Sequence, residues 1–162
     1  MKKHDFKQIF FMKQIIALSK QEFDDNFSNE KFKHYNHAAF ISILDVDNYE
    51  KIYDVSIDNF LQVKMWDIEI DVKDIKTGET YEKPSDFELK KIVDFVNKHK
   101  DKSVFIIHCS AGISRSGAVA TYIKNKFNNE VVDKTFYQKN KFILPNLFIL
   151  NRLTEIDSDN NK

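Results

Sequence analysis

One run of apolar residues stands out from the pattern of apolar and polar positions along the chain. Residues 104–107 are Val-Phe-Ile-Ile, three of them β-branched, and a polar loop follows directly. Such a run is typical of a central strand that is covered on both faces of a parallel sheet. A helical pattern begins at or just after Arg115 and continues to about Phe127. The pattern predicts a strand, a tight loop and a helix, in that order.

Three further runs have the composition of strands. Residues 38–44 form an apolar run that Asp45 ends, and residues 60–68 alternate in part between apolar and polar. Residues 13–18 form a looser run. Branched and aromatic residues between turn-forming residues favour strands in all three places.

Two capping-box patterns predict the starts of helices. Ser19 is followed by Glu22, and we expect a helix from there to about Phe27. Residues 84–88, Pro-Ser-Asp-Phe-Glu, contain the second pattern. The apolar stripe of that helix consists of Leu89, Ile92, Val93 and Val96.

The pattern of apolar and polar residues after the helix that begins near Arg115 predicts further helices only. A short helix is expected over 132–140, and Pro145 at a first-turn position opens a final helix to about Ile156. The polar residues 157–162 are expected to form a frayed tail. Strands that alternate with helices predict an α/β fold, a three-layer-like sandwich whose mostly parallel central sheet is flanked by helices. At 162 residues, positions 1–162 are expected to form a single domain.

The loop after the central strand carries the chemistry. Residues 110–116 precede the helix, so their main-chain N–H groups lack intrahelical partners, and the positive end of the helix dipole lies behind them. Such a loop is suited to a dianion. Cys109 lies at its base, where a helix N-terminus favours the reactive thiolate. Arg115 offers a planar fork for two phosphoryl oxygens.

Other residues of this loop have supporting roles. Gly112 permits a positive φ and a close approach to a ligand. Ser116 can donate its hydroxyl to the cysteine sulfur, and His108 can hydrogen-bond a backbone carbonyl. The predicted phosphate-binding residues are Ser110, Ala111, Gly112, Ile113, Ser114, Arg115 and Ser116.

The segment His108-Cys-Ser-Ala-Gly-Ile-Ser-Arg-Ser-Gly117 resembles the signature of the cysteine-dependent protein tyrosine and dual-specificity phosphatases. Together with Leu-Pro-Asn at 144–146, it is most similar to small tyrosine-phosphatase-like proteins of bacteria and large viruses. The resemblance covers roughly residues 36–155. It implies a protein tyrosine phosphatase-like fold and an aspartate, upstream of the cysteine, that protonates the leaving oxygen.

Asp67, in Met-Trp-Asp-Ile at the end of a predicted strand, is the best match for that acid. Asp71 is the second choice, and Asp74 and Asp86 are more distant ones. The simpler interpretation, in which Asp67 only caps a turn, stays open. With this acid, the residues predict a phosphomonoester hydrolase that works through a cysteinyl-phosphate intermediate, with Cys109, Arg115 and Asp67 as catalytic residues.

The substrate is less defined. A phosphorylated protein is expected, with phosphotyrosine and also phosphoserine or phosphothreonine as candidates. Ser110 and Ile113 stand where lipid phosphatases of this superfamily carry lysines, which disfavours phosphoinositides. The alternatives are a weak or inactive phosphatase that recognises phosphorylated partners, and an RNA 5′-phosphatase.

Composition narrows the setting. The chain has 25 basic and 25 acidic residues, so it gives no electrostatic reason to expect nucleic acid or a membrane as a partner. One cysteine excludes an internal disulfide and a zinc framework, and His34 and His37 are expected to be surface or structural residues and not metal ligands. No metal or cofactor is expected. Lys13 and Gln14 interrupt the N-terminal apolar run, so we expect a soluble, cytoplasmic protein without a signal peptide.

Overall fold

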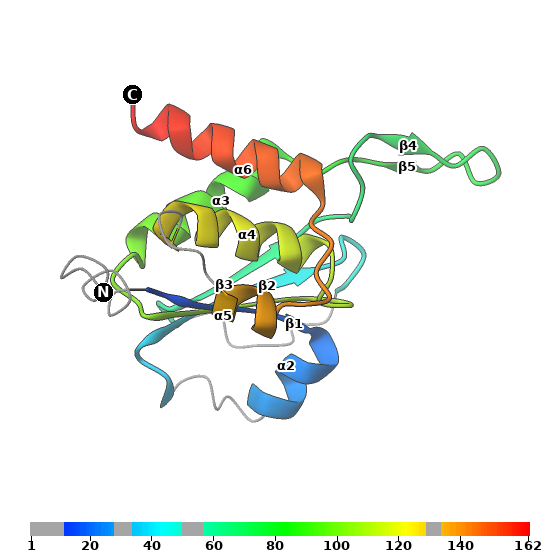
Figure 1. Ribbon diagram of the computed structural model, residues 1–162. Helices are drawn as coiled ribbons and strands as arrows, with labels where there is room; N and C mark the ends of the chain where they lie inside the picture. The colour runs from blue at the N-terminus through cyan, green and yellow to red at the C-terminus, as the bar shows by residue number, and fades with distance from the viewer. Residues whose placement is uncertain (1–11, 28–33, 50–56, 129–133) are drawn as a thin grey trace.

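A four-stranded parallel sheet lies at the centre of the computed structural model, which describes residues 12–27, 34–49, 57–128 and 134–162 (Figure 1). In spatial order its strands are β1 (Gln14–Ser19), β6 (Val104–Cys109), β2 (Ala38–Leu44) and β3 (Phe60–Lys64). Every neighbouring pair is parallel. The apolar run at 104–107 is therefore one of the two inner strands, as its composition predicts.

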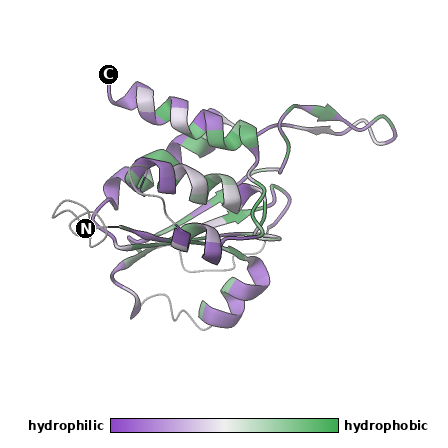
Figure 2. Cartoon of the chain, in the orientation of Figure 1, coloured by the Kyte–Doolittle hydropathy of each residue, from purple (hydrophilic) through white to green (hydrophobic). Residues whose placement is uncertain are grey.

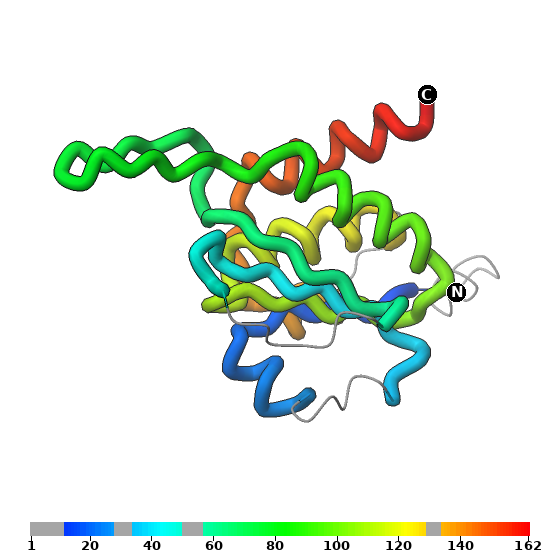
Figure 3. The backbone as a smooth tube through the Cα atoms, turned by 180° about the vertical axis from the view of Figure 1, so that it is seen from behind, coloured from blue at the N-terminus to red at the C-terminus, as the bar shows by residue number. Residues whose placement is uncertain are grey.

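Helices cover both faces of the sheet. The helices α3 (Asp86–Lys98) and α4 (Arg115–Asn128) pack on one face, and α6 (Leu147–Asn160) lies across both of them (Figure 1). The helix α2 (Lys20–Phe27) lies on the opposite face, which the view from behind also shows (Figure 3). The short α5 (Lys134–Lys139) packs beside β1. The predicted α/β sandwich is confirmed.

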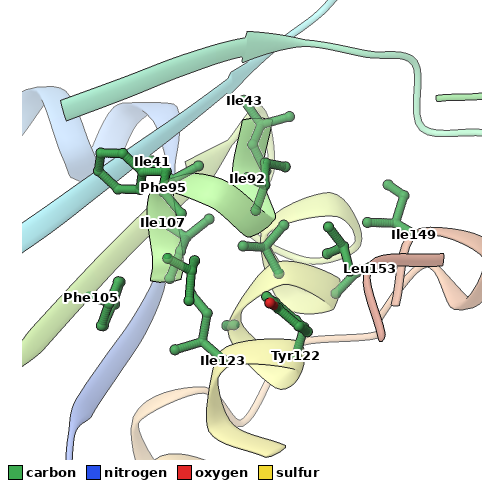
Figure 4. Close-up of a cluster of buried hydrophobic side chains, with 14 of the residues drawn as sticks. Ile41, Ile43, Ile92, Phe95, Phe105, Ile107, Tyr122, Ile123, Ile149 and Leu153 are labelled. Carbon is green, nitrogen blue, oxygen red and sulfur yellow. The ribbon is translucent and has the colours of Figure 1, made fainter. Parts of the chain in front are cut away.

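The core follows from this layering. The larger cluster of buried side chains fills the space between the sheet and the layer of α3, α4 and α6, where Ile41, Ile107 and Ile123 meet (Figure 4). Phe23 of α2 packs against Phe40 on the other face. In Figure 2 the central strands are mainly hydrophobic in colour, whereas α2 is mainly hydrophilic. Burial of apolar side chains therefore holds a helix on each face of the sheet.

The two predicted capping boxes differ in how completely they form. The N–H of Glu22 donates to Ser19 Oγ at 3.1 Å, and the N–H of Ser19 donates back to Glu22 Oε2 at 2.8 Å. Ser85 caps α3 by accepting the N–H of Glu88 at 3.3 Å. The predicted starts of both helices are confirmed.

The predicted strand over 60–68 is too long. The strand β3 ends at Lys64, opposite Leu44, which is the last residue of β2. Beyond that point there is no strand left to pair with, and the chain leaves the sheet. The polar stretch 69–83, for which no element was predicted, contains a hairpin of β4 (Val72–Lys73) and β5 (Thr80–Tyr81) that projects from the body (Figure 1).

The end of the chain also differs from the prediction. Asn146 is the N-cap of α6, so Pro145 precedes the helix instead of lying in its first turn. The helix continues to Asn160, and the expected end near Ile156 and the frayed tail from residue 157 are wrong. The reason lies in the next residue, Asp157, which is buried and accepts hydrogen bonds from α3 and α4.

The remaining boundaries lie close to their predictions. The first strand is shifted by one residue, and α4 includes Asn128. The predicted short helix over 132–140 matches α5, although 132 and 133 lie outside the described residues. Within the part of the chain that is described, no helix is long and apolar enough to cross a membrane.

Candidate active site

The carboxyl ends of the parallel strands meet at one edge of the sheet, which is where α/β proteins place their sites. Cys109 is the last residue of β6. Asp45 follows β2, and the segment from Met65 to Asp67 follows β3. The helix α4 begins at this edge with Arg115. The topology thus brings together residues that are far apart in the sequence.

Cys109 lies at the base of its loop, with only 3% of its surface exposed. Its Sγ is 3.2 Å from the hydroxyl oxygen of Ser116, which is fully buried in the first turn of α4. The loop residues Ser110 and Ala111, directly after the cysteine, are exposed. The sulfur is therefore recessed, with a hydroxyl behind it and the loop around it.

The loop is held in place through its carbonyl groups. The carbonyl of Ser110 accepts the N–H of Lys20 at 3.2 Å, that of Ile113 accepts the N–H of Leu144 at 3.0 Å, and that of Ser114 accepts the N–H of Asn146 at 3.1 Å. Among the described residues, no main-chain N–H from 110 to 116 donates to a backbone carbonyl. These donors remain available for an anion.

Gly112 has the positive φ that the sequence predicts, at 73°. A Cβ at this position would lie 2.4 Å from the nitrogen of Ser19 and 2.5 Å from the carbonyl carbon of Leu18. The close approach in the structure is therefore to the end of β1. The predicted approach of Gly112 to a ligand stays a prediction.

Arg115 is buried, and three acceptors hold its guanidinium. Its Nη1 donates to Asp45 Oδ1 at 2.7 Å and to the carbonyl of Met65 at 2.8 Å, while Nη2 donates to Ser110 Oγ at 3.2 Å. Its Nε is buried and has no partner among the described residues. Nε–H and one N–H of Nη2 lie along the same edge of a guanidinium, which is the pair of donors that binds an oxyanion through two hydrogen bonds.

Asp45 was not predicted as a site residue. In the sequence it appears only as the polar residue that ends a strand. The available signal was topological, because the residue after any parallel strand lies at the edge where ligands bind.

Asp67 contacts the cysteine loop directly. Its Oδ1 accepts hydrogen bonds from Ser114 Oγ at 2.7 Å and from Asn146 Nδ2 at 3.0 Å. The other aspartates considered for the acid have different partners. Asp71 accepts the N–H of Lys83, Asp74 accepts the N–H of Lys76, and Asp86 pairs with Arg152. Of these four carboxylates, Asp67 is the one with a hydrogen bond to the loop.

The ring of His108, the residue before Cys109, lies on the face of the sheet that α2 covers. This ring is completely buried and stacks on the ring of Phe23, with the two ring centroids 4.4 Å apart. Burial lowers the pKa of His108 from 6.5 to about 4, so the imidazole is neutral at neutral pH. The predicted hydrogen bond from His108 to a backbone carbonyl stays a prediction. His34 and His37 are exposed, and no three potential metal-binding side chains cluster in the described part of the chain.

Solved structures identify the fold. The crystal structure of human DUSP28 superposes with a TM-score of 0.52 at 12% identity, covering 91% of this chain and 93% of that one. The crystal structure of DUSP15 superposes with a TM-score of 0.56 at 14% identity, covering 94% of this chain and 88% of that one. At these identities the likeness shows the fold alone, which is the protein tyrosine and dual-specificity phosphatase fold.

A viral relative establishes the family. A protein of Amsacta moorei entomopoxvirus named "Putative tyrosine-protein phosphatase AMV078" is 30% identical over 126 residues, which cover 72% of this chain and 73% of that protein. No family model matches the chain. The chain belongs to the cysteine-dependent protein tyrosine and dual-specificity phosphatases, as the segment from His108 to Gly117 predicts.

Proposed function

We propose that the chain hydrolyses phosphate monoesters on proteins through a cysteinyl-phosphate at Cys109, with phosphotyrosine as the preferred substrate. The observation that carries the proposal is the arrangement around the sulfur. Among the described residues, the N–H groups of residues 110–116 donate to no backbone carbonyl, and Arg115 Nε has no partner. Main-chain donors and a guanidinium edge together suit the equatorial oxygens of a phosphoryl group.

In the first step the Cys109 thiolate attacks phosphorus. An S–P bond forms while the P–O bond to the substrate breaks, and Asp67 gives its proton to the departing oxygen. The loop N–H groups and Arg115 stabilise the charge on the phosphoryl oxygens. The hydrogen bond from Ser114 Oγ to Asp67 Oδ1 supports this assignment, because it holds the Asp67 carboxylate beside the cysteine loop.

In the second step water attacks the cysteinyl-phosphate. Asp67 now accepts a proton from that water, the S–P bond breaks, and inorganic phosphate leaves. The Ser116 hydroxyl, 3.2 Å from the sulfur, donates to the thiolate as it departs. None of these steps uses a group from outside the chain other than water. The mechanism requires a reduced thiol, which fits a reducing compartment such as the cytoplasm.

A pocket beside the loop supports an aromatic substrate. It has a cavity volume of about 310 Å³, and its walls are formed by Asp45, Trp66, Asp67, Ile68, Val72 and Tyr81. The rings of Trp66 and Tyr81 lie 5.3 Å apart in an edge-to-face arrangement. Aromatic walls next to two carboxylates that contact the cysteine loop suit the ring of a phosphotyrosine. The name of the viral relative points to the same substrate.

The decisive test of the function compares the wild-type chain with Cys109→Ser on an aryl phosphate. We expect phosphate release from the wild type and none from the variant, while vanadate binds both. Binding of phosphorylated peptides by the wild type without any release would instead identify a phosphate-recognition protein. Release of phosphate by Cys109→Ser at the wild-type rate would refute the assignment of Cys109 as the nucleophile.

The substrate preference has a separate test. Two peptides of the same sequence, one with phosphotyrosine and one with phosphothreonine, are offered to the wild type and to Tyr81→Ala. We expect a higher kcat/KM for phosphotyrosine, and a smaller ratio between the peptides in the variant, because the variant loses one aromatic wall. Equal values for both peptides in the wild type would contradict the preference.

A further inference from the structure

The segment that carries Asp67 is fastened to the start of α6. Asn146 Nδ2 donates to Asp67 Oδ1 at 3.0 Å and to the carbonyl of Ile68 at 3.4 Å. One residue further along each segment, the N–H of Leu147 donates to Glu69 Oε1 at 3.0 Å. The three consecutive residues 67–69 therefore contact Asn146, which is the N-cap of α6, and Leu147, which is its first residue.

The same asparagine contacts the cysteine loop. Its main-chain N–H donates to the carbonyl of Ser114 at 3.1 Å, and the Ser114 hydroxyl donates to Asp67 Oδ1 at 2.7 Å. Asp67, Ser114 and Asn146 therefore form a closed ring of hydrogen bonds. Asn146 is only 5% exposed, so packing fixes its side chain.

Capping α6 does not by itself explain the asparagine. The Oδ1 of Asn146 accepts the N–H of Ile149 at 3.0 Å, and because that N–H can only donate, it determines which end of the amide is oxygen. Serine and aspartate cap helices about as well as asparagine. What asparagine adds is the Nδ2 donor, which points toward Asp67.

We propose that Asn146 and Glu69 are positioning residues that hold Asp67 against the cysteine loop, ready to protonate the leaving group. The inference rests on the proposed function, because it concerns the acid of that reaction. Two donors engage Oδ1 of Asp67, so Oδ2 is the oxygen that carries the proton. Asn146 and Glu69 act through Asp67 and do not touch the substrate.

The test uses two substrates that differ in their need for an acid. Phenyl phosphate has a poor leaving group that must be protonated, whereas difluoromethylumbelliferyl phosphate has a good one. For Asn146→Ser, which keeps a cap but cannot reach Asp67, we expect kcat on phenyl phosphate to fall about tenfold and kcat on the fluorinated ester to change by less than about twofold. Asn146→Asp keeps the cap and places a carboxylate beside Asp67, so its loss on phenyl phosphate should be larger.

Control variants separate positioning from stability. Asn151→Ser makes the same change at an exposed position of α6 and should leave both rates unchanged. Glu69→Ala should reproduce the selective loss on phenyl phosphate. Glu69→Gln should restore most of it, because an amide oxygen still accepts the Leu147 N–H. The Glu69 pair also keeps the test available if a variant at Asn146 does not fold.

The outcomes are distinguishable. An equal fall on both substrates in the variants of Asn146 and Glu69 would show a structural role and overturn the proposal, as would no change on either substrate. If Asp67→Asn itself fails to slow phenyl phosphate selectively, Asp67 is not the acid and there is nothing for Asn146 to position. If the wild type releases no phosphate from either ester in a Cys109-dependent reaction, the proposed function fails as well.

Discussion

Asp45 Oδ1 lies 2.7 Å from Arg115 Nη1, so the arginine proposed to bind phosphate is already paired with a carboxylate. The two side chains differ in exposure, at 6% for Arg115 and 42% for Asp45. Solvent therefore screens much of the charge of the carboxylate, while its oxygen still fixes the direction of the guanidinium. We infer that Asp45 mainly orients the guanidinium of Arg115 and neutralises little of its charge. Because Asp45 accepts from Nη1, the edge of the guanidinium that carries Nε faces away from Asp45.

Two substitutions at Asp45 separate orientation from charge. Asp45→Asn keeps an oxygen that accepts from Nη1 and removes a negative charge near the bound dianion, so it should bind vanadate more tightly, by about threefold. Asp45→Ala removes the acceptor and should bind vanadate about tenfold more weakly. Inhibition constants for vanadate measure both effects. If the two variants change the affinity in the same direction, orientation is not the main role of Asp45.

Gly112 and Gly78 form a matched pair for a stability prediction. Both have positive φ, 73° and 74°, but a Cβ at Gly78 would meet no atom within 4 Å, whereas at Gly112 it would collide with the backbone of β1. Gly78→Ala should lower the free energy of unfolding by about 1–2 kcal/mol from backbone strain alone. Gly112→Ala should lower it by a further ~1–3 kcal/mol or more from overpacking. Urea denaturation of both variants measures the difference, and equal losses would mean that the contact with β1 is absent in solution.

The buried His108 predicts a loss of stability in acid. Because burial lowers the folded-state pKa of His108 to about 4, below its ordinary value of 6.5, the unfolded chain binds the proton first as the pH falls. The contribution of His108 to stability is complete above pH 6.5 and is lost as the pH falls toward 4, at about 1.4 kcal/mol per pH unit.

The measurement is the free energy of unfolding at several values of pH between 6.5 and 4 for the wild type and for His108→Asn, which does not titrate. The difference between the two proteins should narrow as the pH falls through this range. His34→Gln, at an exposed position, should follow the wild type. A constant difference between wild type and His108→Asn would show that the imidazole is not held neutral.

The features that the sequence predicted well have local causes. The strand, loop and helix around Cys109 follow from an apolar run, a short loop and a helical stripe that are adjacent in the chain. The capping boxes at Ser19 and Ser85 likewise depend on residues three positions apart. Such signals need no knowledge of the remaining fold, which is why they predicted the elements on both sides of the Cys109 loop.

The features that were missed depend on tertiary contacts. Asp45 and Asn146 meet Arg115 and Asp67 across 70 and 79 positions of sequence, and no periodic pattern encodes such a meeting. The extra turn of α6 depends on Asp157, whose partners Asn97 and Lys126 lie on two other helices. The end of β3 was set by the length of its neighbour β2, which a pattern within residues 60–68 cannot show.

Detection of the proposed cysteinyl-phosphate on Cys109 is the most direct test of the mechanism. The Ser116→Ala variant should form the cysteinyl-phosphate but release the sulfur slowly, because the hydroxyl 3.2 Å from Sγ is gone. Mixing this variant with an aryl phosphate labelled with radioactive phosphorus, quenching the mixture in acid and mapping the peptides should place the label on the peptide that contains Cys109. It should also show a burst of phenol release followed by slow turnover. Turnover with no label on that peptide, or with label on another residue, would contradict the assignment of Cys109 as the nucleophile.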